Sequence, residues 1–313
     1  MRVLVTGARG FVGRHLVAAL RERGHAVVQA DHVPHDEALP IDVGDPHAVR
    51  GAVELARPDA IAHLAAQAFV PASTADPQGT FAINALGTLH LLEAVRAGAG
   101  DGGPHPRIVV VSSADVYGLQ PPDAYPLRET TAPRPANPYA ASKIAAEALA
   151  VAYARSYGLD VVVTRAFNHI GPGQDERFAV AGFALQLARV AAGIAPVLSV
   201  GNLEAARDFL DVRDVCAAYV ALLEGAGEAG ELYNIASGTA TSLAEILRRL
   251  VEIAHVPVEI REDPARMRPA DIPVSVGDAS KLRDATGWNP RISLAAALRA
   301  VYDDARERVQ VTR

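Results

Sequence analysis

One pair of side chains in this sequence has a spacing that suits proton transfer. Tyr139 and Lys143 are four residues apart, and Lys143 is one of only two lysines, with Lys281, among 30 basic residues. Positions i and i+4 share one face of a helix, so the phenol and the ammonium can point into one pocket. A nearby cation lowers a tyrosine pKa from its ordinary value of about 10, which predicts a Tyr139 able to exchange protons near neutral pH. An exposed helix without chemistry has the same spacing.

Two elements must position these groups, a helix and a strand. Asn137 and Pro138 suit the N-cap and the first position of a helix that carries both side chains. Residues 108–113 read Ile-Val-Val-Val-Ser-Ser, a buried strand that delivers hydroxyl groups at its carboxyl end. Ligands of doubly wound sheets bind at that end. Ser113 is the candidate catalytic hydroxyl, and Ser112 is the alternative because neighbouring side chains of a strand point to opposite faces.

A glycine-rich turn near the first residues predicts a dinucleotide site. An apolar run at residues 2–6 is followed by Gly-Ala-Arg-Gly-Phe-Val-Gly at 7–13 and by a helical pattern at 14–20. The first glycine allows the tight turn, the second lets backbone N–H groups approach a pyrophosphate, and the third permits close packing of helix on strand. The alternative is a purely structural turn. The residues assigned to cofactor binding here are Gly7, Gly10, Phe11, Val12 and Gly13.

The end of the second predicted strand bears on the choice of cofactor. Asp31 follows residues 26–30, where an acid typically accepts hydrogen bonds from the adenosine ribose and repels a 2′-phosphate. It favours NAD(H), with NADP(H) as the alternative, because a turn aspartate before Pro34 has the same pattern and His32 weakens the preference. The other expected cofactor contacts are the adenine edge and the small residues of a fourth strand end, Asp42, Val43, Leu64, Ala65 and Ala66.

Composition excludes several classes of partner. The chain has 313 residues, a net charge of −6 and no basic run, which argues against nucleic acid. Its 50% hydrophobic and 21% charged residues are typical of a soluble globular protein. There is no apolar stretch of membrane-spanning length and no signal-peptide layout, and the single Cys216 fits a reducing compartment. We therefore expect a cytoplasmic protein without a membrane partner.

In their order and spacing, these motifs resemble the extended short-chain dehydrogenase/reductase family, in the branch that modifies nucleotide sugars. The matching segments are residues 6–13, 63–67, 84–88, 112–118, 138–143, 207–214 and 287–290. The resemblance implies an NAD(P) cofactor, an active site of Ser113, Tyr139 and Lys143, and a nucleotide-diphosphate sugar as substrate. It also implies a homodimer in which helices at 84–97 and 139–157 pack together, although these helices could simply be buried against the sheet.

The expected fold is α/β. Strands and helices alternate through the first half, which predicts a Rossmann-type doubly wound parallel sheet with a smaller C-terminal substrate-binding lobe. We assign 1–170 to the NAD(P)-binding domain, with 206–236 returning to it. Residues 171–205 and 237–313 are assigned to the nucleotide-sugar-binding lobe.

Two segments narrow the resemblance. Residues 165–174 and 200–209 look like those of the GDP-4-keto-6-deoxy-mannose reductases. The resemblance implies that Asn168 bonds the nucleotide diphosphate and that Arg207 and Arg268 clamp its charge, a task that suits the planar guanidinium. Ion pairing of Arg207 with Asp208 or Asp211, and a surface position for Arg268, are the alternatives. His169 has no second ligand at metal-binding spacing, so it is assigned to the cofactor site and no metal is expected.

These roles describe a ketone reduction. Tyr139 would protonate the alkoxide formed at C4 of a 4-keto-6-deoxy-hexose, Ser113 would donate to the same oxygen, and Lys143 would hold the nicotinamide ribose. An NAD-dependent 4-epimerase uses the same three residues, and Asp31 suits its retained cofactor. A 4,6-dehydratase needs more carboxyl groups than Asp115, the only acid next to the serines, and is disfavoured. A regulatory NAD(P)-binding protein without turnover is disfavoured because all three catalytic groups are present.

Overall fold

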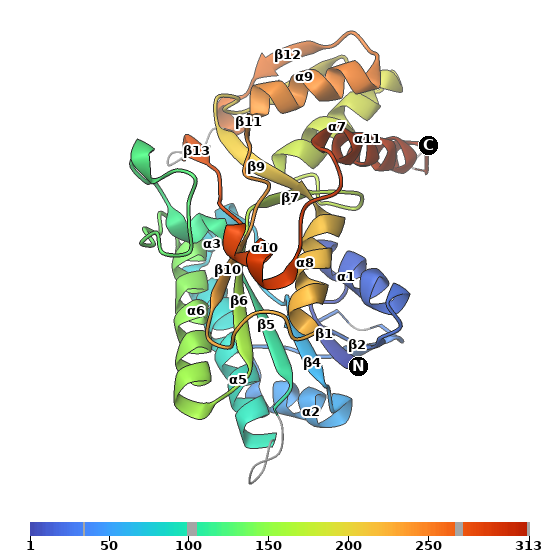
Figure 1. The fold of residues 1–313 in the computed structure, drawn as a ribbon. Helices are drawn as coiled ribbons and strands as arrows, with labels where there is room; N and C mark the ends of the chain where they lie inside the picture. Colours follow the sequence, from blue (N-terminus) through green and yellow to red (C-terminus); the bar gives the residue numbers. More distant parts are fainter. Residues whose placement is uncertain (34, 99–104, 267–271, 312–313) are drawn as a thin grey trace.

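The computed structural model describes residues 1–33, 35–98, 105–266 and 272–311. Its larger lobe is built on a seven-stranded sheet in which every neighbouring pair is parallel (Figure 1). Its order is β10-β6-β5-β4-β1-β2-β3, so the winding direction reverses between β1 and β4. The predicted doubly wound sheet is confirmed. Its strands are β1 (Arg2–Thr6), β2 (Ala26–Asp31), β3 (Ala38–Pro40), β4 (Ala60–His63), β5 (Arg107–Ser113), β6 (Val161–Ala166) and β10 (Leu232–Ile235).

Helices cover both faces of this sheet, which explains why its central strands are continuous apolar runs. Val3 and Val5 pack with α1 (Phe11–Glu22) and α8 (Val212–Leu223). Leu4 points to the opposite face and packs in the core formed with the other helices. These are α2 (Pro46–Ala56), α5 (Gly87–Gly98) and α6 (Pro138–Tyr157), seen on the other side of the sheet from α1 and α8 in Figure 1. Short helices α3 (Val70–Ala75), α4 (Pro77–Phe81) and α10 (Ser280–Thr286) complete the lobe.

A second, smaller lobe has its own core. Its sheet contains β7 (Asn168–Ile170), β9 (Ala206–Asp211), β11 (Ala240–Ser242) and β13 (Val274–Ser275). Strands β8 (Val197–Val200) and β12 (Glu259–Glu262) form a separate pair. The helices are α7 (Ala179–Ala191), α9 (Leu243–Ala254) and α11 (Leu294–Val311), grouped around β9 in Figure 1.

The lobe boundaries in the structure differ from the expected ones at two strands. Strand β7 belongs to the small sheet, so the chain leaves the large sheet before residue 168 and not at residue 171. Strand β9 also belongs to the small sheet, so the chain returns to the large lobe with α8 and not at residue 206. The reason is that β7 and β9 pair with each other.

Helix α6 is defined at both ends by local chemistry. The side chain of Asn137 accepts a hydrogen bond from the N–H of Ala140 at 2.8 Å, and Pro138 occupies the first position, as predicted. Gly158 ends the helix in the left-handed conformation. The expected helix from Asn84 differs, because Ala82–Leu86 forms a π-helical turn before α5. Among the described residues, none of the helices has the length and apolar content to cross a membrane.

Candidate active site

Tyr139 and Ser113 meet at the carboxyl end of β5. Tyr139 lies in the first turn of α6 and is buried, and the hydroxyl of Ser113, the last residue of the strand, is near enough to lower the pKa of its phenol. The Ser113 Oγ also accepts a hydrogen bond from the N–H of Asp115 at 3.2 Å. Ser112 instead donates to the carboxylate of Glu147 at 2.6 Å. The geometry therefore selects Ser113 over Ser112 as the hydroxyl beside the phenol.

Lys143 lies one turn further along α6 and is also buried. Its Nζ donates to the backbone carbonyl of Val111 at 2.8 Å. Burial lowers the pKa of Lys143 to about 8, and the negative charge of Glu147 opposes this shift.

The expectation that Lys143 lowers the pKa of Tyr139 is wrong for this structure. Burial raises the pKa of Tyr139, the charge of Asp115 raises it further, and the Ser113 hydroxyl lowers it. Burial disfavours the phenolate more than its neighbours stabilise it. Tyr139 is therefore held as a neutral phenol, the form that can donate a proton.

The glycine turn after β1 fits the pyrophosphate of a dinucleotide. Gly7 has a φ of +68°, and a Cβ there would lie 2.9 Å from the N atom of Ala65. A Cβ on Gly13 would lie 2.2 Å from the carbonyl oxygen of Gly7, so helix α1 can approach the turn only because that atom is missing. Gly10 is the N-cap of α1 and supplies no side-chain cap, which leaves the first-turn N–H groups, at Phe11 and Val12, for an anion.

Asp31 has partners that the sequence did not reveal. Its two carboxylate oxygens accept hydrogen bonds from the backbone N–H groups of Arg9 at 2.9 Å and Val33 at 3.2 Å. The exposed His32 imidazole lies 3.2 Å from the same carboxylate. Asp31 thus ties the glycine turn to the end of β2 whether or not it also contacts a ribose.

The remaining predicted cofactor residues lie on loops around this turn. The Ala65 N–H, within the Leu64 to Ala66 segment after β4, donates to the Thr6 hydroxyl at 3.2 Å. Asp42 is exposed and caps its own turn by accepting from the N–H of Gly44 at 2.8 Å. Val43 is buried and packs against the start of α5.

The small lobe places two of the predicted substrate residues on paired strands. Asn168 is exposed on β7, opposite Phe209 of β9, the strand that also carries Arg207. The acids considered as partners of Arg207 are engaged elsewhere: Asp208 accepts from Ser237 at 2.6 Å, and Asp211 pairs with Arg213 at 2.7 Å. Arg268 lies outside the described residues.

His169 connects the two lobes. Its ring stacks over that of Phe11, with centroids 6.0 Å apart and planes 7° apart. Its Nδ1 is 2.9 Å from the carbonyl of Phe167, and burial lowers its pKa. In the described part of the chain, His, Cys, Asp and Glu form no group of three or more that could hold a metal ion.

Three buried polar side chains next to these residues were not predicted as site residues. Asn84, in the π-helical turn, donates to the Ser142 hydroxyl at 2.9 Å. His63 contacts the Thr6 hydroxyl through Nδ1 at 2.9 Å, and burial together with the charge of Lys143 lowers its pKa to about 3. Glu147 continues the four-residue spacing of the tyrosine and lysine, which is the one signal that could have identified it.

Comparison with known proteins places this geometry in a family. The family model described as GDP-mannose 4,6 dehydratase matches residues 4–301. The chain belongs to this family. Its membership confirms the resemblance that the motifs indicated.

Relatives within and around the GDP-mannose 4,6-dehydratase family match the whole chain. GDP-6-deoxy-D-mannose reductase of Pseudomonas aeruginosa is 43% identical over 312 residues, covering 99% of this chain and 98% of that protein. The structure of RMD from Pseudomonas aeruginosa complexed with NADPH has a TM-score of 0.88 at 42% identity, covering 98% of this chain and all of that one. UDP-glucose 4-epimerase of Thermus thermophilus, solved with NAD, has a TM-score of 0.86 at 34% identity, covering 98% and 99% of the two chains.

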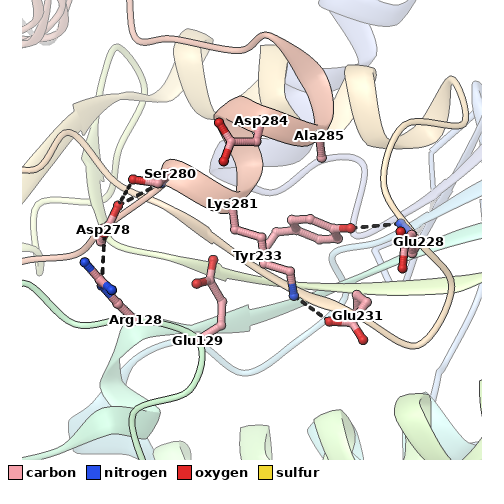
Figure 2. Close-up of a pocket in the computed structure, with 10 residues that line it drawn as sticks. All are labelled: Arg128, Glu129, Glu228, Glu231, Tyr233, Asp278, Ser280, Lys281, Asp284 and Ala285. Atoms are coloured by element: carbon pink, nitrogen blue, oxygen red, sulfur yellow. Dashed lines mark hydrogen bonds and ion pairs between the residues drawn. The ribbon is translucent and has the colours of Figure 1, made fainter.

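A cavity of about 590 Å³ lies elsewhere on this family member, beside β10 (Figure 2). None of the predicted site residues that the structure describes lines it. Its charges are largely paired: Lys281 bonds Glu231 at 2.5 Å and lies over the Tyr233 ring, and Arg128 is 3.2 Å from Asp278. The second lysine of the chain therefore belongs to a surface ion pair and not to the candidate active site.

Proposed function

We propose that this protein uses NAD(P)H to reduce the C4 keto group of a nucleotide-activated 4-keto-6-deoxy-hexose. The observation that carries the proposal is a buried, neutral Tyr139 beside the Ser113 hydroxyl at the carboxyl end of β5, with Lys143 one turn away. The full-length similarity to GDP-6-deoxy-D-mannose reductase supports a GDP-linked substrate.

The side chains would divide the work of the reduction. When bound, the nicotinamide supplies the hydride that adds to the C4 carbon. The Tyr139 hydroxyl gives its proton to the oxygen as the C=O π electrons move onto it, and solvent later returns a proton to the phenolate. Ser113 donates a hydrogen bond to the same oxygen and stabilises its developing charge. Lys143 holds the nicotinamide ribose and keeps a positive charge beside the phenolate.

Both dinucleotides are accepted in this proposal, and Asp31 sets their ratio. The RMD structure contains NADPH, whereas the epimerase structure contains NAD. Asp31 would repel a 2′-phosphate and so favour NAD(H), but its oxygens already accept backbone hydrogen bonds and His32 lies beside it. The imidazole and the backbone donors weaken that repulsion enough for NADP(H) to bind.

The small lobe would bind the nucleotide diphosphate. Asn168 and Arg207 lie on adjacent strands, β7 and β9, and can donate to phosphate oxygens from one side. Arginine suits this role because its fork bonds two oxygens at once. Arg268 is also proposed to bind the diphosphate, and this role rests on its position in the sequence alone.

A homodimer and a cytoplasmic location complete the proposal. Helix α6 and the segment before α5 expose large apolar side chains that a second copy would cover: Phe81 is 38% exposed, Leu86 48% and Tyr157 51%. The location rests on the composition and stays a prediction.

The test is a turnover assay with a GDP-4-keto-6-deoxy-hexose. We expect loss of the reduced-nicotinamide absorbance together with formation of the C4 alcohol, identified by NMR. The second candidate, a 4-epimerase, is favoured by the similarity to UDP-glucose 4-epimerase. Interconversion of UDP-hexoses without added cofactor, combined with no reduction by either dinucleotide, would replace the reductase by the epimerase.

A further inference from the structure

Glu147 is a buried carboxylate that the proposed reduction does not use. It lies on α6 and is 5% exposed. Its Oε1 accepts hydrogen bonds from Ser112 at 2.6 Å and from Arg165 Nε at 2.9 Å, and its Oε2 accepts from Arg165 Nη2 at 2.6 Å. Strands β5 and β6 thus both hold this one side chain.

Burying the ion pair of Glu147 and Arg165 costs desolvation free energy, so a contribution to stability does not by itself explain why the pair is present. Both charges are almost fully removed from water, and the desolvation of such a pair often exceeds its Coulombic gain. Apolar side chains of similar volume are frequently as stable or more stable at such positions. A role other than stability therefore has to be sought in what else the carboxylate faces.

The neighbour that matters is Lys143. It precedes Glu147 by four residues, so both side chains leave the same face of α6 toward the sheet, and both are buried. A buried ammonium needs a compensating charge or hydrogen bonds. In the described part of the chain, the acceptor that Nζ contacts is the neutral carbonyl of Val111.

The other ionisable groups around Lys143 do not supply that charge. His63, on β4, is held neutral by burial and by the lysine itself. Asp115, after β5, acts on Tyr139. Arg165, on β6, is a second cation. Among the described residues, Glu147 is the anion that favours the charged form of Lys143.

We propose that Glu147 is a positioning residue for the proposed reduction: it is the buried counterion that keeps Lys143 charged, and Ser112 and Arg165 hold it in place. Only the expected effect of Glu147 on turnover rests on the proposed function. The counterion itself is a property of the folded protein and can be measured without a substrate.

The scarcity of lysine makes the measurement direct. With isotope-labelled lysine, the full-length protein gives two side-chain NMR signals, and K281R assigns them by removing one. We expect the Lys143 signal to titrate with a midpoint near pH 8. In E147Q the midpoint should fall by about one pH unit or more, with or without NADH, because an opposite charge has been removed. D214N is the matched control, since it neutralises another buried carboxylate, on α8, and should leave the midpoint unchanged.

Each outcome decides the proposal. A folded E147Q with the wild-type midpoint overturns it. If E147Q does not fold, E147D takes its place, since it keeps the pair with Arg165 but withdraws the carboxylate by one methylene: a lowered midpoint supports the proposal and an unchanged one overturns it. In turnover, the alkaline limb of kcat/KM should move by the same amount as the NMR midpoint. A failure of the reduction assay alone refutes the proposed function and leaves the NMR result standing.

Discussion

At the scale of single residues, burial decides the protonation state of the candidate catalytic groups. Tyr139 and Lys143 have the spacing of a phenol activated by a cation. Their pKa values nevertheless shift in the directions opposite to such activation: that of the phenol rises and that of the ammonium falls. Both shifts favour the neutral form because both groups are taken out of water. A phenol that stays protonated suits reduction, where the group must give up a proton.

Replacing the phenol tests this directly. Tyr139→Phe removes only the hydroxyl, so we expect kcat to fall by roughly 10²- to 10⁴-fold, the usual contribution of general acid catalysis. Affinity for NADH, measured by fluorescence titration, should change little. A variant that keeps more than about a tenth of the wild-type kcat would remove Tyr139 from the proposed role.

The pH dependence follows from Lys143. Its pKa in the folded protein is about 8, below the ordinary lysine value, so the charged form is lost as the pH rises through 8. Tyr139 stays protonated over the same range because its pKa is raised. We expect kcat/KM for the reduction to fall above pH 8 with the loss of one proton. A profile that is flat up to pH 10 would contradict this assignment.

Asp31 can be tested by the choice of cofactor. Asp31→Asn removes the charge that we propose opposes a 2′-phosphate, so the ratio of kcat/KM for NADPH over NADH should rise by about tenfold, which corresponds to about 1.4 kcal/mol. Glu54→Gln, which neutralises an exposed acid on α2 with no assigned role, is the control and should leave the ratio unchanged. An unaltered ratio in Asp31→Asn would mean that this carboxylate only braces the glycine turn.

At the scale of elements, the sequence predicts what depends on local chemistry. The strand ending in Ser113 and the helix starting at Pro138 were predictable because apolar runs, an N-cap and a proline act within a few residues. The backbone partners of Asp31 and the role of Glu147 were not, because they depend on which strands lie side by side. The position of β9 was not predictable for the same reason, because it pairs with β7 and belongs to the small sheet.

The glycine turn yields a prediction about close packing. In Gly13→Ala the new Cβ would lie 2.2 Å from the Gly7 carbonyl oxygen, so α1 must move away from the turn. We expect at least about a tenfold weaker affinity for NADH and a lower melting temperature. Gly51→Ala, in α2, has no atom within 4 Å of its new Cβ and should be neutral or stabilised by about 1 kcal/mol. Equal effects of the two changes would count against the packing argument.

At the scale of the whole molecule, the proposed dimer can be tested through its exposed leucines. Leu86 is 48% exposed next to α5, on the proposed contact, and Leu55 is 66% exposed on α2. We expect Leu86→Asp to produce monomers in light scattering, because a charge buried in an apolar interface is unfavourable. Leu55→Asp should leave the assembly unchanged. A wild-type protein that is already monomeric would contradict the proposal outright.

The path of the chain between the two lobes also limits how such a protein can evolve. Strand β10 and helix α8, which complete the large lobe, come after β7, α7 and β9 of the small one. A fragment ending near residue 170 would lack α8, and the apolar side chains of Val3, Val5 and Val109 that pack with it would be left in water. The small lobe therefore cannot be exchanged as one continuous segment of the chain. Any exchange of the small lobe has to keep α8 and β10 joined to the large sheet.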